Sequence, residues 1–136
     1  MKICAPDSPC PCGRLDSRSR PVRYGDCCGR YLDADTAAPD AEHLMRSRYS
    51  AFVLEREAYL LATWHGSTRP QQVPFDVGVK WLGLEVRKHL PRDAGRAEVE
   101  FVARHKPAGS SAVRLHEQSR FVREDGRWYY VDGNFK

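Results

Sequence analysis

The sequence has no long hydrophobic run. None of its segments reaches the roughly 18 consecutive apolar residues of a membrane-spanning helix, and the stretch from Lys2 to Asp7 lacks the apolar core of a secretion signal. We therefore expect no membrane partner and a cytoplasmic location. In that reducing compartment cysteines remain thiols or bind metals, and disulfides are rare.

The chain also lacks a strong excess of charge of one sign. Among its 136 residues, 22 lysines and arginines stand against 18 acids, which gives a net charge of +4. A dedicated nucleic-acid-binding protein concentrates many more positive charges in one stripe. We therefore expect no nucleic-acid partner, except through the ribosome.

Large aliphatic side chains are scarce in residues 1–33, which we call the knuckle segment. This segment is rich in Pro, Gly, Ser and Arg, and too poor in apolar side chains to form a core of its own. We expect it to be held by a cross-link, and to form a unit separate from residues 34–136.

The knuckle segment does contain Cys10, Cys12, Cys27 and Cys28, and a glycine directly follows each pair. Four sulfur donors around one point suit tetrahedral zinc, and they also accept iron. Cys27 and Cys28 are adjacent, which is a poor geometry for a disulfide between them. The pattern therefore predicts one metal site with these four ligands. Cys4 is left as a free thiol or a substitute ligand.

Basic residues outnumber acids in the first thirty positions, by six to three. Four thiolates on a divalent ion leave a net negative charge, which nearby arginines can balance. We expect the knuckle to present its arginines to a partner: Arg14, Arg18, Arg20, Arg23 and Arg30.

Helical patterns follow a short linker. Asp40 has the character of an N-cap, and apolar residues at helical spacing predict an amphipathic helix over 41–55. A second helix is predicted over 58–64, and residues 65–79 read as a loop with a helical turn near Phe75.

Beyond residue 80 the hydrophobic pattern alternates. Four strands are expected within 82–90, 98–104, 113–121 and 128–131, and the pair Asp125-Gly126 signals a tight turn before the last one. Two helices followed by four antiparallel strands predict an α+β fold, in which a curved antiparallel sheet packs on the helices.

The run Cys10-Pro11-Cys12-Gly13 with Cys27-Cys28-Gly29 resembles the SEC-C motif, a zinc knuckle also found at the end of the SecA translocase ATPase. With the runs over 40–52, 59–65 and 119–133, the whole sequence resembles the YchJ-like bacterial proteins. The resemblance implies a nuclear-transport-factor-2-like domain, a cone of curved sheet and helices, preceded by the zinc knuckle. The family itself is largely uncharacterised.

Two features depart from the knuckle pattern of that family, which reads Cys-Pro-Cys-Gly-Ser-Gly with eight residues before the second pair. Here Arg14 and Leu15 replace Ser-Gly, and fourteen residues lie between Cys12 and Cys27. The longer loop costs only about 0.5 kcal/mol of closure entropy, against about 10 kcal/mol or more from structural zinc. Loss of the second glycine is the more serious change, because such knuckles rely on a tight turn.

Cones of this class often enclose a pocket, and some relatives of the fold are enzymes. The candidate pocket residues are Tyr49, Trp64, His65, Glu117, Tyr130 and Asp132. The ring of His65 is more simply a cap for the carbonyls that end its helix. Glu117 shares a face with apolar residues, so a buried ion pair with Arg46 or Arg48 is favoured over a general base. We assign no catalytic residue.

These observations predict a zinc-binding adaptor without catalysis of its own. By analogy with the SecA tail, its partner is a chaperone, the translocation machinery or the translating ribosome. The alternative is a small-molecule-binding protein or enzyme that uses the interior of the cone, with Trp64, His65, Glu117 and Tyr130 around the ligand.

Overall fold

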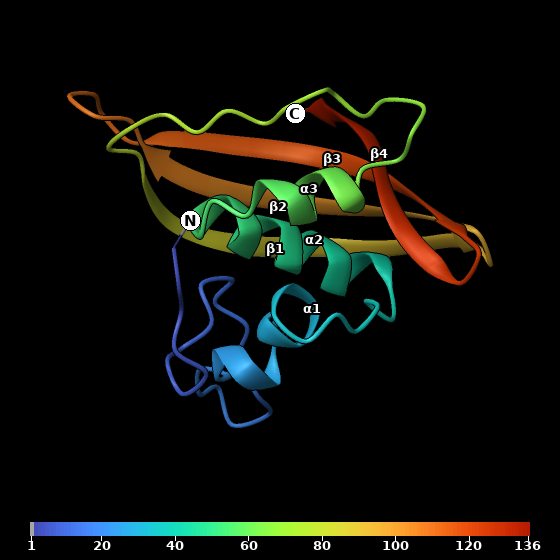
Figure 1. Ribbon diagram of the computed structural model, residues 1–136, viewed down its shortest axis with the longest axis horizontal. Coiled ribbons are helices and arrows are strands. Elements are labelled where there is room, and N and C mark those ends of the chain that lie inside the picture. Colours follow the sequence, from blue (N-terminus) through green and yellow to red (C-terminus); the bar gives the residue numbers. More distant parts are fainter. Residues whose placement is uncertain (1) are drawn as a thin grey trace.

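The computed structural model describes residues 2–136, so Met1, the first residue of the predicted knuckle segment, lies outside the described part (Figure 1). The first half is helical: η1 (Tyr24–Asp26), α1 (Gly29–Leu32), α2 (Ala41–Val53) and α3 (Glu57–Ala62). The second half is all strand: β1 (Lys80–Asp93), β2 (Arg96–Lys106), β3 (Val113–Glu124) and β4 (Arg127–Phe135).

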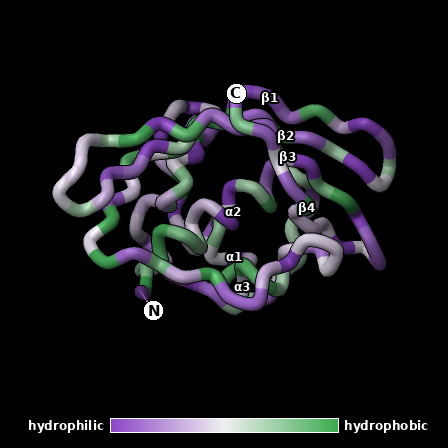
Figure 2. The backbone as a smooth tube through the Cα atoms, turned by 90° about the horizontal axis from the view of Figure 1, so that it is seen from above, coloured by the Kyte–Doolittle hydropathy of each residue, from purple (hydrophilic) through white to green (hydrophobic). Residues whose placement is uncertain are grey.

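The strands form one antiparallel sheet in the order β1-β2-β3-β4. Asp125 and Gly126 turn the chain from β3 into β4 with φ values of 52° and 78°, the left-handed conformation that a two-residue hairpin requires. The sheet curves around α2 and α3, and hydrophilic and hydrophobic residues alternate along its strands (Figures 1 and 2). The predicted α+β cone is confirmed.

Helix α2 runs along the inside of this curve. Its N-cap is Asp40, as predicted, since Asp40 Oδ1 accepts a hydrogen bond from the backbone N–H of His43 at 2.8 Å. The helix ends at Val53, two residues before the predicted end, and Glu55 then takes a φ of 56°, which a helix does not allow. Within residues 2–136, no helix combines the length and the apolar character needed to cross a bilayer.

The chain leaving α3 closes the cone against the edge strand β4. The backbone N–H of His65 donates to the carbonyl of Tyr130 at 2.7 Å, and that of Tyr130 donates to the carbonyl of Thr63 at 2.9 Å. Residues 65–79 then form a loop, as predicted. No helical turn occurs near Phe75, which instead packs edge-on to the ring of Phe52.

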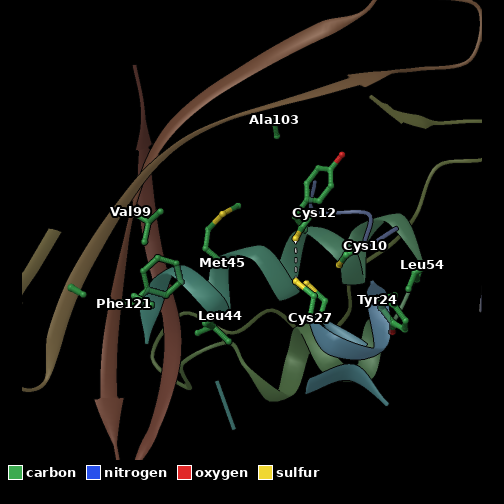
Figure 3. Packing of buried hydrophobic residues seen from close by; sticks show 14 residues of the cluster. Cys10, Cys12, Tyr24, Cys27, Leu44, Met45, Leu54, Val99, Ala103 and Phe121 are labelled. Carbon is green, nitrogen blue, oxygen red and sulfur yellow. Dashed lines mark hydrogen bonds between the residues drawn. The ribbon is translucent and has the colours of Figure 1, made fainter. Parts of the chain in front are cut away.

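The knuckle segment shares one hydrophobic core with the cone. Its four clustered cysteines and the fully buried Tyr24 belong to the same group of contacting residues as Leu44 and Met45 of α2 and Val99 and Phe121 of the sheet (Figure 3). The apolar surface that the segment lacks is therefore supplied by α2. The division of the chain at residue 33 stays a prediction.

Candidate metal centre and cone cavity

Four cysteine sulfur atoms of the knuckle segment lie close together. The Sγ atoms of Cys10, Cys12, Cys27 and Cys28 all lie within 4.8 Å of one another, and all four residues are buried. Those of Cys12 and Cys27 are 3.7 Å apart (Figure 3). Tetrahedral zinc with Zn–S bonds of about 2.3 Å needs sulfur atoms about 3.8 Å apart. The donor set therefore fits a four-coordinate soft metal ion.

A tight turn positions the first cysteine pair. The backbone N–H of Gly13 donates to the carbonyl of Cys10 at 3.1 Å, and Gly13 has a φ of 73°, a region that glycine enters without strain. Leu15 stands where the family pattern has its second glycine, and its φ is not positive. Replacing that glycine therefore adds no backbone strain here.

The second pair lies where η1 runs into α1. At Gly29, directly after Cys28, a Cβ atom would lie 2.8 Å from the carbonyl oxygen of Tyr24 and 3.0 Å from its ring. The glycine is thus required by the close approach of two backbone segments. This approach folds the chain back so that both sulfur atoms of the pair face the first turn.

The fourteen residues between Cys12 and Cys27 fold into a separate turn. Leu15 and Pro21 form an antiparallel bridge, and Asp16 Oδ1 accepts hydrogen bonds from the backbone N–H groups of Arg18 at 2.8 Å and Arg20 at 3.0 Å. The inserted residues form an exposed turn, and they leave the sulfur cluster closed.

Metal-free, the cluster does not readily carry four negative charges. Hydrogen bonds from the thiols of Cys10, Cys12 and Cys28 hold the pKa of Cys27 well below that of an ordinary thiol. The pKa of Cys28 is raised, because its thiol is bonded to those of Cys10, Cys12 and Cys27 and is buried. The pKa of Cys10 is also lowered, chiefly by a hydrogen bond from Cys12, and that of Cys12 is raised, so two thiolates are stabilised at the expense of the other two thiols. A divalent cation supplies the charge that allows all four to ionise.

Three arginines lie against this cluster. Arg14 Nη1 is 4.0 Å from the sulfur of Cys27, and Arg30 Nε donates to the Cys27 carbonyl at 3.1 Å. Arg46, from α2, donates from Nη1 to the carbonyl of Cys12 at 3.4 Å. The sequence did not predict Arg46 in this role, since nothing in the local pattern links α2 to the first cysteine turn.

The remaining knuckle arginines face outward. Arg18, Arg20 and Arg23 are exposed, and the last two form only solvent-exposed ion pairs, with Asp16 and Asp7. The five arginines predicted to meet a partner therefore divide into two groups. Three are available on the surface, and two balance the charge of the cluster.

A cavity of about 270 Å³ lies between α2 and the inner face of the sheet. Four of the predicted pocket residues line it together: Tyr49, Trp64, Glu117 and Tyr130. The other two do not. His65 contacts Glu124 through Nε2 at 2.9 Å and Ser67 through Nδ1 at 2.7 Å, so it neither enters the cavity nor caps the carbonyls of α3.

Asp132 lies on the opposite face of the sheet from the cavity. Arg120 pairs with Asp132 while the next residue, Phe121, pairs with Tyr130, so β4 carries an extra residue at this point. Such a bulge reverses the alternation of side chains. Asp132 is turned outward, where its Oδ1 accepts a hydrogen bond from Arg120 Nε at 2.6 Å.

The predicted ion pair of Glu117 is not formed. Ser119 Oγ donates to Glu117 Oε2, and neither candidate arginine lies within 4 Å of its carboxylate. Arg46 pairs with Glu42 at 3.1 Å, and Arg48 lines the cavity instead. The position of Arg48 could have been predicted, because it lies four residues after Leu44 and four before Phe52, on the buried stripe of α2.

Comparison with known proteins identifies a matching family. Residues 40–133 match the family described as YchJ, middle NTF2-like domain. A UPF0225 protein of a Polaromonas species is 67% identical over 131 residues, which cover 95% of this chain and 94% of the relative.

Two solved structures have similar folds. The solution structure of a SEC-C motif containing protein from Rhodopseudomonas palustris has a TM-score of 0.77 and 32% identity, and the match covers 93% of this chain and 98% of the other. The crystal structure of a SEC-C motif containing protein from Psychrobacter arcticus has a TM-score of 0.77 and 33% identity, with coverage of 96% and 84%.

Proposed function

Because this chain belongs to the YchJ-like family of UPF0225 proteins, we propose that it is a zinc-binding adaptor of the bacterial cytosol. In this proposal Cys10, Cys12, Cys27 and Cys28 hold the ion as thiolates. The observation that carries it is the convergence of their four buried sulfur atoms within 4.8 Å. The SEC-C motif named for both similar structures supports the same assignment. Iron accepts the same donors, and metal analysis distinguishes the two.

The role of this metal is structural. Four protein thiolates fill a tetrahedral site and leave no open position for a substrate. The bound ion joins the two cysteine turns, and Cys10 and Cys12 also contact the core that α2 contributes. Metal binding is therefore coupled to the docking of the knuckle segment on the cone.

The outer side of the knuckle segment supports a role in protein interaction. Arg18, Arg20 and Arg23 are exposed there, and two apolar side chains are exposed on the same segment, Leu15 at 54% and Ile3 at 89%. A segment that exposes both cations and apolar groups suits a partner surface that carries acids and apolar side chains. A chaperone, a translocation component or a ribosome-associated protein is the partner we propose.

Metal analysis of protein purified without a histidine tag tests the site. We expect close to one equivalent of zinc per chain, lost in Cys27→Ser. The matched control is Cys4→Ser, which should keep its metal because Cys4 lies outside the cluster. Less than about half an equivalent of zinc or iron, unchanged by Cys27→Ser, would contradict the proposal.

Capture of partners from a bacterial lysate tests the interaction. The double variant Arg18→Glu, Arg20→Glu reverses two exposed charges that belong to the exposed turn and not to the sulfur cluster, and it should lose the partner. The control variant replaces Arg104 and Arg114 with glutamate. Both arginines are exposed and lie opposite each other on β2 and β3. Equal capture by both double variants would show that the knuckle does not carry the interaction.

A further inference from the structure

The cone cavity has an apolar, largely aromatic wall. Tyr49 and Phe52 of α2 face Trp81, Phe101 and Leu115 of the sheet across its volume of about 270 Å³. An apolar cavity of about 150 Å³ is large enough to bind benzene. This one therefore has room for an aromatic ring with substituents.

One positively charged side chain, that of Arg48, is part of this wall. Arg48 is only 6% exposed, and its Nη1 donates to the carbonyl of Leu60 at 2.8 Å and to Thr63 Oγ1 at 2.7 Å. The centre of its guanidinium group lies 4.9 Å from the ring of Trp64 and 4.7 Å from that of Tyr130. Within residues 2–136 no carboxylate lies within 4 Å of it. The positive charge of Arg48 is thus stabilised by two aromatic rings and by neutral hydrogen-bond acceptors.

Two nitrogen atoms of Arg48 have no hydrogen-bond acceptor in the described part of the chain, namely Nε and Nη2. They are not sealed off either. Within residues 2–136, the unpartnered side-chain atoms with almost no accessible surface belong to Tyr24, Trp64 and His105, so Nε and Nη2 of Arg48 each keep some. Since Arg48 lines the cavity, we infer that a ligand in the cavity can reach these N–H groups. Burial also lowers the pKa of Arg48 to about 10, because removal from water disfavours its charged form.

We propose that the cone cavity binds a small aromatic carboxylate, whose carboxylate group is held by Arg48 and whose ring lies among the aromatic side chains. A guanidinium presents parallel N–H groups that match the two oxygens of a carboxylate. This site is separate from the metal centre and goes beyond the proposed adaptor function.

Glu117 favours ligands that carry a hydroxyl group on the ring. Glu117 lines the cavity, its carboxylate lies more than 4 Å from every arginine within residues 2–136, and it accepts a hydrogen bond from Ser119. A ligand with a hydroxyl group on the ring can donate to this carboxylate, whereas a bare ring leaves it unpaired. We therefore expect 4-hydroxybenzoate to bind more tightly than benzoate.

Titration of the metal-loaded full chain, followed by amide and indole NMR shifts, tests the proposal. Benzoate should give saturable shifts at cavity residues, Trp64 among them. Benzyl alcohol, which has the ring without the charge, and acetate, which has the charge without the ring, should each bind at least about tenfold more weakly. Absence of saturable shifts with benzoate and 4-hydroxybenzoate, or equal binding of the comparators, would overturn the assignment.

Three variants separate the contributions. Arg48→Met should weaken benzoate at least about tenfold and leave benzyl alcohol nearly unchanged. Leu115→Trp adds a large side chain to the cavity from the sheet side and leaves Leu60 and Thr63, the acceptors of Arg48, in place. It should abolish binding of both benzoate and benzyl alcohol. Glu117→Gln removes an opposing carboxylate and should strengthen benzoate. If Arg48→Met does not fold, the other two variants decide, and unchanged benzoate binding in both would refute the proposal.

Discussion

Arg46 of α2 and Cys12 of the knuckle segment are joined by a hydrogen bond, in which Arg46 Nη1 donates to the Cys12 carbonyl at 3.4 Å. The same guanidinium donates from Nε to Glu42 Oε2 at 3.1 Å. One helix turn of the cone therefore holds the first cysteine turn in place. The stability of the metal centre is linked to α2 through this contact.

Arg46→Gln should loosen the metal centre. It removes one hydrogen bond to a carbonyl and a positive charge beside the cluster, at a cost of about 1 kcal/mol. We expect zinc to be lost several-fold faster to a colorimetric chelator. The control is Arg87→Gln, which removes an exposed arginine that pairs with Glu85. Equal release rates in the two variants would show that Arg46 does not support the centre.

Gly29→Ala should destabilise the knuckle. A Cβ atom at this position meets the Tyr24 carbonyl at 2.8 Å, and overpacking of this kind costs about 1–3 kcal/mol. Urea unfolding measures the loss. At Gly66 a Cβ would meet nothing within 4 Å, so Gly66→Ala is the matched control and should be close to neutral. An equal effect at the two glycines would contradict the close packing of Gly29 on Tyr24.

Gly13→Ala should weaken metal binding through backbone strain alone. Its φ is 73°, and the nearest atom to a new Cβ is 4.0 Å away, so no clash is involved. Holding an L-residue in this conformation costs about 1–2 kcal/mol. Competition with a chelator should show a correspondingly higher dissociation constant for zinc. Gly13→Asn should lie between alanine and wild type, because asparagine tolerates this region better.

Asp40 should contribute stability that depends on pH. Burial tends to raise the pKa of its carboxyl group, but hydrogen bonds from the backbone and ring of His43 outweigh this and lower it. A lowered folded-state pKa gives stability that is complete above the unfolded pKa of about 4 and is lost as pH falls through the folded value.

Asp40→Asn keeps a capping oxygen without the titration, whereas Asp40→Ala removes the cap at a cost of about 1 kcal/mol. The difference in unfolding free energy between wild type and Asp40→Asn should shrink as the pH falls below about 4. Comparing the two proteins cancels the loss of metal that acid causes in both. A difference that does not shrink below about pH 4 would contradict the assignment.

Local signals predicted the elements whose cause is local. Asp40 caps α2 through a residue three positions away, and Asp125-Gly126 turns the chain within two residues. The two cysteine pairs could be grouped because their residue type restricts their chemistry. In each case a short stretch of sequence contains the whole physical reason.

The features that sequence reasoning missed depend on long-range contacts. A bulge in β4, set by its pairing with β3, turns Asp132 away from the cavity. Arg48 was expected as one of two candidate partners of Glu117, yet its hydrogen bonds go to Leu60 of α3 and to Thr63 just beyond it. Neither the register of a strand nor the partner of a buried arginine follows from local periodicity.

X-ray absorption at the zinc edge of the untagged protein tests the central claim most directly. Four sulfur neighbours at about 2.3 Å, with no nitrogen or oxygen ligand, are the predicted result. A spectrum with fewer than four sulfur neighbours, or with light-atom ligands in their place, would contradict a site built from Cys10, Cys12, Cys27 and Cys28.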